Sequence, residues 1–165
     1  MGGAAMKNQI LEILRTAART GNAEIARRLD LTEEQVAQEV ARLERNKTVL
    51  GYRAIVNPEK LEDEPTLGII EVKITPQRSV GYDEIAAQIY RFPEVKLCYL
   101  ISGSYDVLVF IEGKNLKEVA TFVSQKLATI DNVTSTTTHF ILKKYKEASI
   151  IISEEAATER LPVTP

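Results

Sequence analysis

The chain has little of the chemistry on which secreted proteins and metalloproteins depend. Its 165 residues include one cysteine, Cys98, and one histidine, His139. A single cysteine excludes an internal disulfide, and its place in an apolar run predicts a buried structural thiol. His139 has no cysteine, histidine or nearby carboxylate in sequence with which to hold a metal. We therefore expect no metal and no other cofactor.

Long apolar runs and catalytic signatures are also missing. No apolar run is long enough to span a bilayer, and the first residues lack the regions of a signal peptide, so we expect a cytoplasmic protein with no membrane partner. There is no Gly-rich phosphate loop, no serine or cysteine nucleophile motif, and no carboxylate pair beside a base. The sequence thus argues against an enzyme. We treat residues 1–5, which precede Met6, as a leader outside the fold.

Charge is distributed unevenly along the chain. Residues 1–60 carry ten Lys and Arg against eight Asp and Glu, whereas residues 61–165 carry eleven against fifteen. The small excess of positive charge in residues 1–60 favours a nucleic-acid partner for that part only. A content of 44% hydrophobic residues is enough to build real cores, and the length allows two small domains.

The N-terminal third predicts three helices. Apolar spacing indicates a helix over residues 8–20 and a second over 23–29, for which Asn22 is the expected cap. Thr32 and Gln35 have the spacing of a capping box, which opens a third helix. The residues of this third helix expected to face inward are Val36, Val40 and Leu43.

The short turn between the second and the third predicted helices predicts a helix-turn-helix unit, with the third helix in the major groove of DNA. Glutamine can read adenine and arginine can read guanine or phosphate, whereas outward glutamates repel the backbone. Further basic residues, including Arg27 and Arg28, are candidate phosphate contacts. A three-helix module that packs or dimerises without touching DNA remains an alternative. The predicted DNA-binding residues are Gln35, Gln38, Glu39, Arg42, Arg45, Lys47 and Arg53.

The next segment predicts a domain boundary. β-Branched residues within 49–56 indicate a small wing or a strand, which Asn57-Pro58 ends. An acidic, polar stretch then predicts a linker. The expected domains are 6–56 for the helix-turn-helix part, 57–66 for the linker, 67–146 for a second domain, and 147–165 for a tail without assigned function.

The second domain repeats one pattern twice. Its apolar periodicities predict the order strand, helix, strand, strand, helix, strand, which is the ferredoxin-like arrangement with both helices on one face of the sheet. Strands at 97–101 and 107–111 are apolar at nearly every position, so the other face is also hydrophobic. We expect a second copy of the chain to cover it. The predicted elements span 67–75, 82–92, 95–102, 105–112, 116–130 and 133–145.

One tight turn carries candidate binding chemistry. Gly103 offers a small backbone and Asp106 a carboxylate beside apolar residues, which suits a zwitterionic amino acid. Two simpler interpretations stay open, because the glycine can serve only the turn and the aspartate can serve only as its cap. Residues 136–138 are likewise good strand formers whatever they bind.

With both halves in place, the chain resembles the Lrp/AsnC family of bacterial and archaeal transcription regulators, and closely resembles its members from Gram-positive bacteria. The resemblance covers about residues 7–146, and the order and spacing of its motifs carry it. These motifs are Ala23-Glu-Ile-Ala-Arg-Arg-Leu29, Leu31-Thr-Glu-Glu-Gln-Val36, Leu50-Gly-Tyr-Arg-Ala-Ile-Val56, Ser102-Gly-Ser-Tyr-Asp106, Thr136-Thr-Thr138 and Lys143 to Lys146.

The resemblance implies an α+β chain with a winged helix-turn-helix domain that binds double-stranded DNA. It also implies a hinge strand and a ferredoxin-like domain that binds an amino-acid effector and forms homodimers, often assembled into tetramers of dimers. Asp106 would hold the ammonium of the effector, and amides near Gly103 its carboxylate, at an interface between dimers. The implied effector-binding residues are Tyr99, Ser102, Gly103, Ser104, Tyr105, Asp106, Thr136, Thr138, His139, Phe140 and Ile141.

The chain departs from the family at Glu39, a position that is often basic. This departure leaves open a sensor or assembly module that has lost DNA binding. Siroheme decarboxylases share the two-domain architecture, so haem-precursor chemistry is a second, less favoured alternative.

Overall fold

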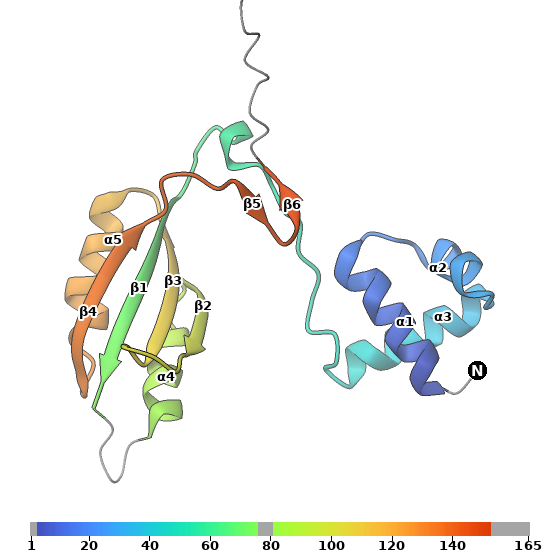
Figure 1. Cartoon of the computed structure of the whole chain (residues 1–165), viewed down its shortest axis with the longest axis horizontal. Coiled ribbons are helices and arrows are strands. Elements are labelled where there is room, and N and C mark those ends of the chain that lie inside the picture. The colour runs from blue at the N-terminus through green and yellow to red at the C-terminus, as the bar shows by residue number, and fades with distance from the viewer. Residues whose placement is uncertain (1–2, 76–80, 153–165) are drawn as a thin grey trace, which may run out of the picture. The chain divides into compact units, whose positions relative to one another are not determined.

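The computed structural model describes residues 3–75 and 81–152; residues 1–2 of the predicted leader and the tail beyond 152 lie outside this part. The chain divides into two compact units, residues 1–55 and 56–165. The first unit is helical and the second is built on a sheet (Figure 1).

Three helices form the first unit around a small apolar core. They are α1 (Gly3–Thr16), α2 (Asn22–Leu29) and α3 (Glu33–Arg45). Asp30 ends α2 in the left-handed conformation, with φ of 55°, and this turns the chain sharply into α3. The α2–turn–α3 pair is the helix-turn-helix predicted from the sequence. The buried side chains of the core are Ile10, Leu14, Ile25, Ala26, Val36 and Leu43.

The helix ends differ from prediction where local chemistry differs. The first helix begins at Gly3 and ends at Thr16 rather than spanning 8–20. The prediction of a leader over residues 1–5 is therefore wrong for residues 3–5, where alanines extend the helix by a turn. At the other end, the hydroxyl of Thr16 donates to the carbonyls of Glu12 and Ile13. Asn22 is wrong as a cap, since it is the first residue of α2 and Gly21 precedes it without a side-chain bond.

The predicted capping box at the start of α3 is confirmed. The hydroxyl oxygen of Thr32 accepts a hydrogen bond from the backbone N–H of Gln35 at 3.2 Å. The side-chain oxygen of Gln35 accepts in turn from the backbone N–H of Thr32 at 2.9 Å. Two otherwise unpaired amides at the helix start are thereby satisfied, which fixes the point at which α3 begins.

The segment between the units has no regular structure. Between Arg45 and the single 3-10 turn η1 (Pro58–Lys60), the described residues form neither helix nor strand, so the expected wing is not formed there. Leu50 is 86% exposed, and Tyr52 and Val56 are also exposed. A β-branched stretch without a neighbouring strand has no ladder to join, and propensity alone does not make one.

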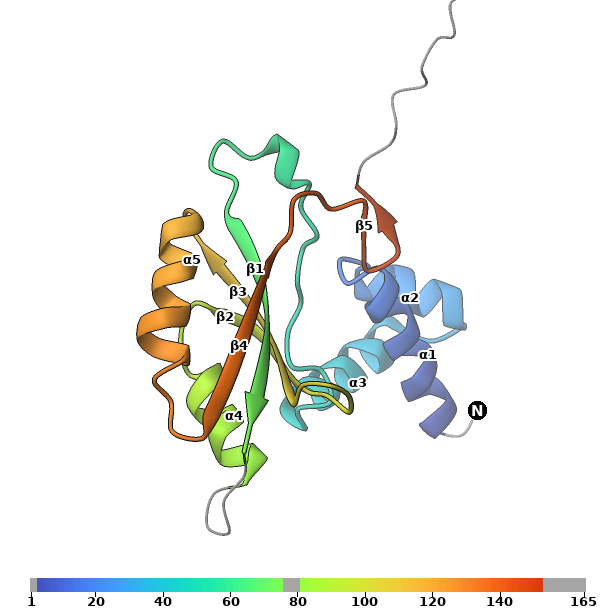
Figure 2. The same cartoon turned by 60° about the vertical axis from the view of Figure 1, so that its left-hand side comes forward.

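The second unit has the predicted order of elements. Its helices α4 (Tyr82–Tyr90) and α5 (Leu116–Phe122) lie on the same side of one antiparallel sheet (Figures 1 and 2). The strand order is β2-β3-β1-β4, which is the ferredoxin-like arrangement. The strands are β1 (Thr66–Ile74), β2 (Val95–Leu100), β3 (Val107–Gly113) and β4 (Val133–Phe140).

Alternate residues of the central strands build the core under the helices. Ile70 pairs with Val109 and Val72 with Val107, and all four side chains are fully buried. Gly68 lies in the same row, where an added Cβ would come within 3.1 Å of a methyl of Val119. The close packing of α5 on β1 therefore leaves little room for a side chain at this position.

The helix α5 continues into a π-helical turn, η2 (Val123–Leu127), instead of running on as predicted to residue 130. The N–H of Ala128 donates to the carbonyl of Val123 at 2.8 Å, which is the five-residue step of a π-turn. Phe122 and Leu127 are both buried. In an α-helix a step of five residues would point them about 140° apart, so the wider turn is what puts both on the core side.

The other face of the sheet carries the remaining residues of the alternation. Ile69 pairs with Phe110, and Tyr99 pairs with Leu108. The rings of Tyr99 and Phe110 meet edge to face, with centroids 6.3 Å apart. Within this unit, no helix of the described residues lies on that side (Figure 2). We call Ile69, Tyr99, Leu108 and Phe110 the open face.

The chain ends its described part in a short hairpin. The last strand stops at Phe140 rather than at 145, and β5 (Lys146–Glu147) then pairs with β6 (Ile150–Ile151). Ala148 and Ser149 form the two-residue turn, with φ of 43° and 71°, as a type I′ hairpin requires. No helix in the described ranges is long and apolar enough to cross a membrane.

Candidate functional site

One stripe of α3 presents polar side chains away from the core. Gln38, Arg42 and Arg45 are exposed on successive turns, and Gln35 begins the row. Together with Met6 of α1 and with Glu39 and Ala41 of α3, they line a hollow of about 520 Å³. Hydrogen-bonding groups at this spacing on one helix match what a helix in a major groove must display.

Glu39 does not belong to this stripe, which corrects the expectation that it faces outward. Its residue surface is 6% exposed, and its carboxylate accepts from Arg42 Nε at 2.7 Å and from Arg42 Nη2 at 2.6 Å. The Arg42 guanidinium holds the pKa of Glu39 below its usual value, against the effect of burial. Glu39 therefore presents no free negative charge to a partner, because Arg42 neutralises it.

A second carboxylate in this unit holds two of the candidate phosphate contacts. Glu24 accepts from Nε and Nη2 of Arg27 at 2.9 and 2.7 Å, and from Nε of Arg28 at 2.8 Å. These hydrogen bonds lower the pKa of Glu24 to about 2. A DNA phosphate would have to compete with this carboxylate for both arginines.

The remaining predicted DNA contacts differ in how free they are. Reading adenine requires both the oxygen and the nitrogen of a glutamine amide, and the oxygen of Gln35 is already used in the capping box. Gln38 and Arg45 are exposed and make no side-chain hydrogen bond within the described part of the chain. Lys47, with φ of 56°, follows the helix end, and Arg53 lies in the irregular segment. Gln38 and Arg45 are thus the most available.

In the second unit, Asp106 ties two strands together. Its Oδ2 accepts from the backbone N–H of Ile74 at 2.7 Å, and its Oδ1 accepts from the hydroxyl of Tyr82 at 3.5 Å. Its own N–H donates to the carbonyl of Val72 at 3.0 Å. The aspartate therefore has a structural role at the turn. Each carboxylate oxygen has a second lone pair with which to accept another donor.

Gly103 has no structural reason to be glycine. Its φ is not positive, and an added Cβ would meet only a methyl of Ile101, at 3.8 Å. An alanine would fit the turn as built. The simpler interpretation, in which the turn itself requires this glycine, is therefore not supported by the turn geometry.

The predicted effector residues do not gather at one place within a single chain. Thr136 pairs with Val72, to which Asp106 also bonds, so Thr136 lies level with the turn. Phe140 pairs with Gly68, four residues and about 13 Å further along the sheet. Ile141 continues in that direction, with its N–H on the carbonyl of Leu67. A site that used both groups would need residues from another copy.

The sheet also separates the predicted residues by face. Thr136, Thr138 and Phe140 lie on the side of the helices by alternation, whereas His139 lies on the open side beside Ile69. The Nε2 of His139 is 3.4 Å from a carboxylate oxygen of Glu71. Tyr99 stands on the same open side, at the opposite edge of the sheet. The remaining turn residues, Ser102, Ser104 and Tyr105, lie beside Gly103.

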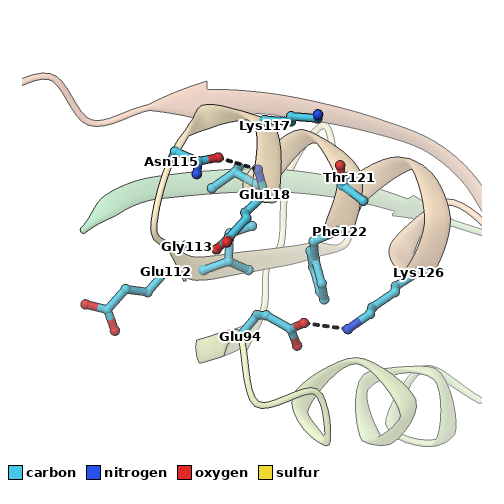
Figure 3. Close-up of a pocket in the computed structure, with 11 residues that line it drawn as sticks. Glu94, Glu112, Gly113, Asn115, Lys117, Glu118, Thr121, Phe122 and Lys126 are labelled. Carbon is cyan, nitrogen blue, oxygen red and sulfur yellow. Dashed lines mark hydrogen bonds and ion pairs between the residues drawn. The ribbon is translucent and has the colours of Figure 1, made fainter.

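A cavity of about 410 Å³ lies between α5, the end of β3 and the segment before β2 (Figure 3), and no motif in the sequence indicated it. Glu94 accepts from Lys126 Nζ across it at 2.5 Å, and this ammonium holds the pKa of Glu94 below its usual value. The same ammonium is 5.6 Å from the ring centre of Phe92 and 5.8 Å from that of Phe122. Because 32 residues separate the pair, no local pattern could have predicted it.

The described residues contain no group of three histidines, cysteines or carboxylates placed to hold a metal ion. Cys98 is half-buried under the helices, and burial raises the pKa of its thiol. The cavity beside α5 is crossed by the Glu94–Lys126 ion pair, which joins α5 to the segment before β2. We interpret this pair as a structural connection.

Comparisons with known proteins cover both units. Residues 67–151 match the family described as the Lrp/AsnC ligand binding domain. The chain is 42% identical over 160 residues to the uncharacterized HTH-type transcriptional regulator YugG of Bacillus subtilis, covering 96% of each chain. It is 34% identical over 137 residues to the HTH-type transcriptional regulator LrpA of Pyrococcus horikoshii, covering 83% of this chain and 94% of that relative.

A solved structure resembles the chain over most of its length. A transcriptional regulator of Neisseria meningitidis, in complex with L-methionine, matches with a TM-score of 0.69 and 25% identity. The match covers 86% of this chain and 91% of that chain. It therefore extends over the helical unit as well as the sheet.

Proposed function

Because the chain belongs to the Lrp/AsnC family of transcriptional regulators, we propose that it regulates transcription by binding double-stranded DNA through α3, and that a small amino acid modulates this binding. The observation that carries the proposal is the α2–turn–α3 unit, whose capping box fixes α3 and whose exposed stripe displays Gln38, Arg42 and Arg45.

The effector site that we propose lies at the turn of Gly103 and Asp106. The free space at Gly103 supports a close approach by a ligand carboxylate to the backbone, and Asp106 keeps lone pairs for an ammonium. The methionine complex of the Neisseria meningitidis regulator supports an amino acid as the class of ligand. Because one chain does not bring Asp106 and Phe140 together, we place the site between copies.

We also propose that the open face forms a homodimer, from which a tetramer of dimers can assemble. Four large apolar side chains lie on this face, and leaving them in water costs roughly 25 cal/mol per Å² of apolar surface. A two-fold contact between identical sheets removes this cost with one self-complementary patch. A DNA-binding protein of this kind would act in the cytoplasm.

The test of DNA binding uses the full chain and a random duplex library. We expect repeated selection to enrich a sequence with two half-sites, which fluorescence anisotropy then shows to bind more tightly than unrelated duplex at the same salt concentration. If selection enriches no sequence, and the chain binds duplex only non-specifically or not at all, this proposal is wrong.

The test of effector binding is a thermal-shift screen against the twenty amino acids. A ligand at one hundred times its dissociation constant stabilises the protein that binds it by about 2.7 kcal/mol, which is a clear shift in Tm. We expect one or a few amino acids to raise Tm and to change the affinity for the selected duplex. If none does either, the chain does not respond to amino acids.

A further inference from the structure

The geometry of Arg42 divides its guanidinium into an occupied edge and a free edge. Glu39 takes one N–H from Nε and one from Nη2. An arginine has five N–H donors in a planar fork, so both donors of Nη1 and one of Nη2 remain. These free donors lie at the end of the side chain, which is 48% exposed.

The free edge has the shape that guanine requires. In the major groove, guanine presents N7 and O6 as adjacent acceptors, and the end of an arginine fork can donate to both. A phosphate is a less favourable partner here, because Glu39 already neutralises the charge of this guanidinium and leaves little net attraction for a second anion. The edge of a base is uncharged and needs only the free N–H donors. The pair therefore favours a base over the backbone.

The burial of Glu39 makes this arrangement more than a surface ion pair. An exposed pair leaves both side chains free to exchange partners, as at Glu24, which two arginines share. Glu39 is almost wholly buried within its unit and bonds one arginine through both oxygens. It therefore holds Arg42 in one position before any partner arrives.

We propose that Arg42 reads one guanine of each half-site and that Glu39 is the positioning residue that orients it. This inference rests on the proposed binding of DNA by α3, and it adds which base is read and how the reading residue is held. Since ordering a long side chain upon binding is costly, a prealigned Arg42 increases the affinity for the correct sequence more than the affinity for unrelated DNA.

The test compares Glu39→Gln and Arg42→Lys with the parent chain. Glutamine keeps the size of Glu39 but has one carbonyl oxygen in place of a bidentate carboxylate, and lysine cannot form the fork. Arg42→Ala is avoided because it would leave Glu39 buried without its partner. The control is Glu34→Gln, which removes the same charge from an exposed glutamate of the same helix that makes no side-chain bond within the described part of the chain.

The measurement is the ratio of affinities for the selected duplex and an unrelated duplex, followed by replacement of each guanine with 7-deazaguanine, which lacks the N7 acceptor. For the parent, we expect a loss of roughly 5- to 150-fold at one guanine of each half-site. Glu39→Gln should lower the affinity ratio by roughly 2- to 10-fold. Arg42→Lys should abolish the sensitivity to 7-deazaguanine, and Glu34→Gln should leave the ratio unchanged.

A purely structural or electrostatic role gives different results. If Glu39 acts only through its charge, Glu39→Gln changes both affinities equally, as Glu34→Gln does, and the inference is overturned. It is also overturned if Arg42→Lys keeps the parent's sensitivity to 7-deazaguanine. If the parent selects no sequence at all, the proposed function fails together with this inference, whereas selection with an unchanged ratio rejects the inference alone.

Discussion

The carboxylate of Asp106 bonds the backbone N–H of Ile74 at 2.7 Å, across 32 residues of sequence. The pairing of β1 with β3 ends at Val72 and Val107, so the side chain supplies an acceptor just beyond the last backbone pair. The residue that we propose as the effector anchor thus also fastens the sheet at the turn. The two roles can be separated, because only an ammonium requires the negative charge.

Asp106→Asn and Asp106→Ala make this separation. Asparagine retains an acceptor for Ile74, so we expect a Tm close to that of the parent and amino-acid binding at least about tenfold weaker. Alanine removes the acceptor as well and should lower stability by about 1–3 kcal/mol. Thermal unfolding and calorimetry measure the two effects. Unchanged effector affinity in the folded asparagine variant would show that Asp106 is only structural.

Gly103 and Gly68 make a matched pair of substitutions. Gly103→Ala places its Cβ in free space, so its stability should stay within about 0.5–1 kcal/mol of the parent, while effector binding weakens. Gly68→Ala drives a Cβ to within 3.1 Å of Val119 and should destabilise the sheet unit by about 1–3 kcal/mol. Circular dichroism during heating compares the two. If Gly103→Ala kept full effector affinity, the ligand would not approach the backbone at Gly103 as we propose.

The pH dependence of stability should reveal the Glu24 cluster. The pKa of Glu24 falls from 4.5 to about 2 on folding. The contribution of this carboxylate to stability is therefore fully present above pH 4.5 and is lost as the pH falls through 2. Glu24→Gln should therefore lower Tm near neutral pH, and its difference from the parent should shrink between pH 4.5 and 2. A difference in Tm that stays constant across this range would contradict the assigned pKa.

A charge on the open face should prevent dimerisation. Phe110→Arg places a cation among apolar residues of that face, and two-fold symmetry repeats the defect on the partner. We expect sedimentation velocity to show an 18.4 kDa monomer, while the parent sediments as a dimer or larger assembly. Leu116→Lys, at an exposed position of α5, should leave assembly unchanged. A parent that is itself monomeric would refute the proposed interface.

The sequence predicted what local patterns control. The capping box of α3 and the order of elements in the second unit follow from spacing alone, and both are confirmed. Glu39 illustrates the limit of such patterns. It lies between Val36 and Leu43 on the inner stripe, and reading every charge as outward placed it wrongly. The partner three residues later, Arg42, was the available signal, because residues at that spacing meet on a helix.

Other features depend on contacts that the sequence does not display. The segment 49–56 has the composition of a strand but no neighbouring strand with which to pair in the described part of its unit. The Glu94–Lys126 pair joins elements that only tertiary folding brings together. The open space at Gly103 likewise depends on how the turn folds, and the sequence cannot show it because glycine often serves a turn for its backbone freedom alone.

The π-turn of η2 has a consequence for changes in chain length. It brings Phe122 and Leu127 to one side although five residues separate them. Deleting one residue between them would give a step of four, which an ordinary α-helix also places on one side, about 40° apart. The helix that covers the sheet can therefore lose a residue at this point without exchanging its inner and outer surfaces.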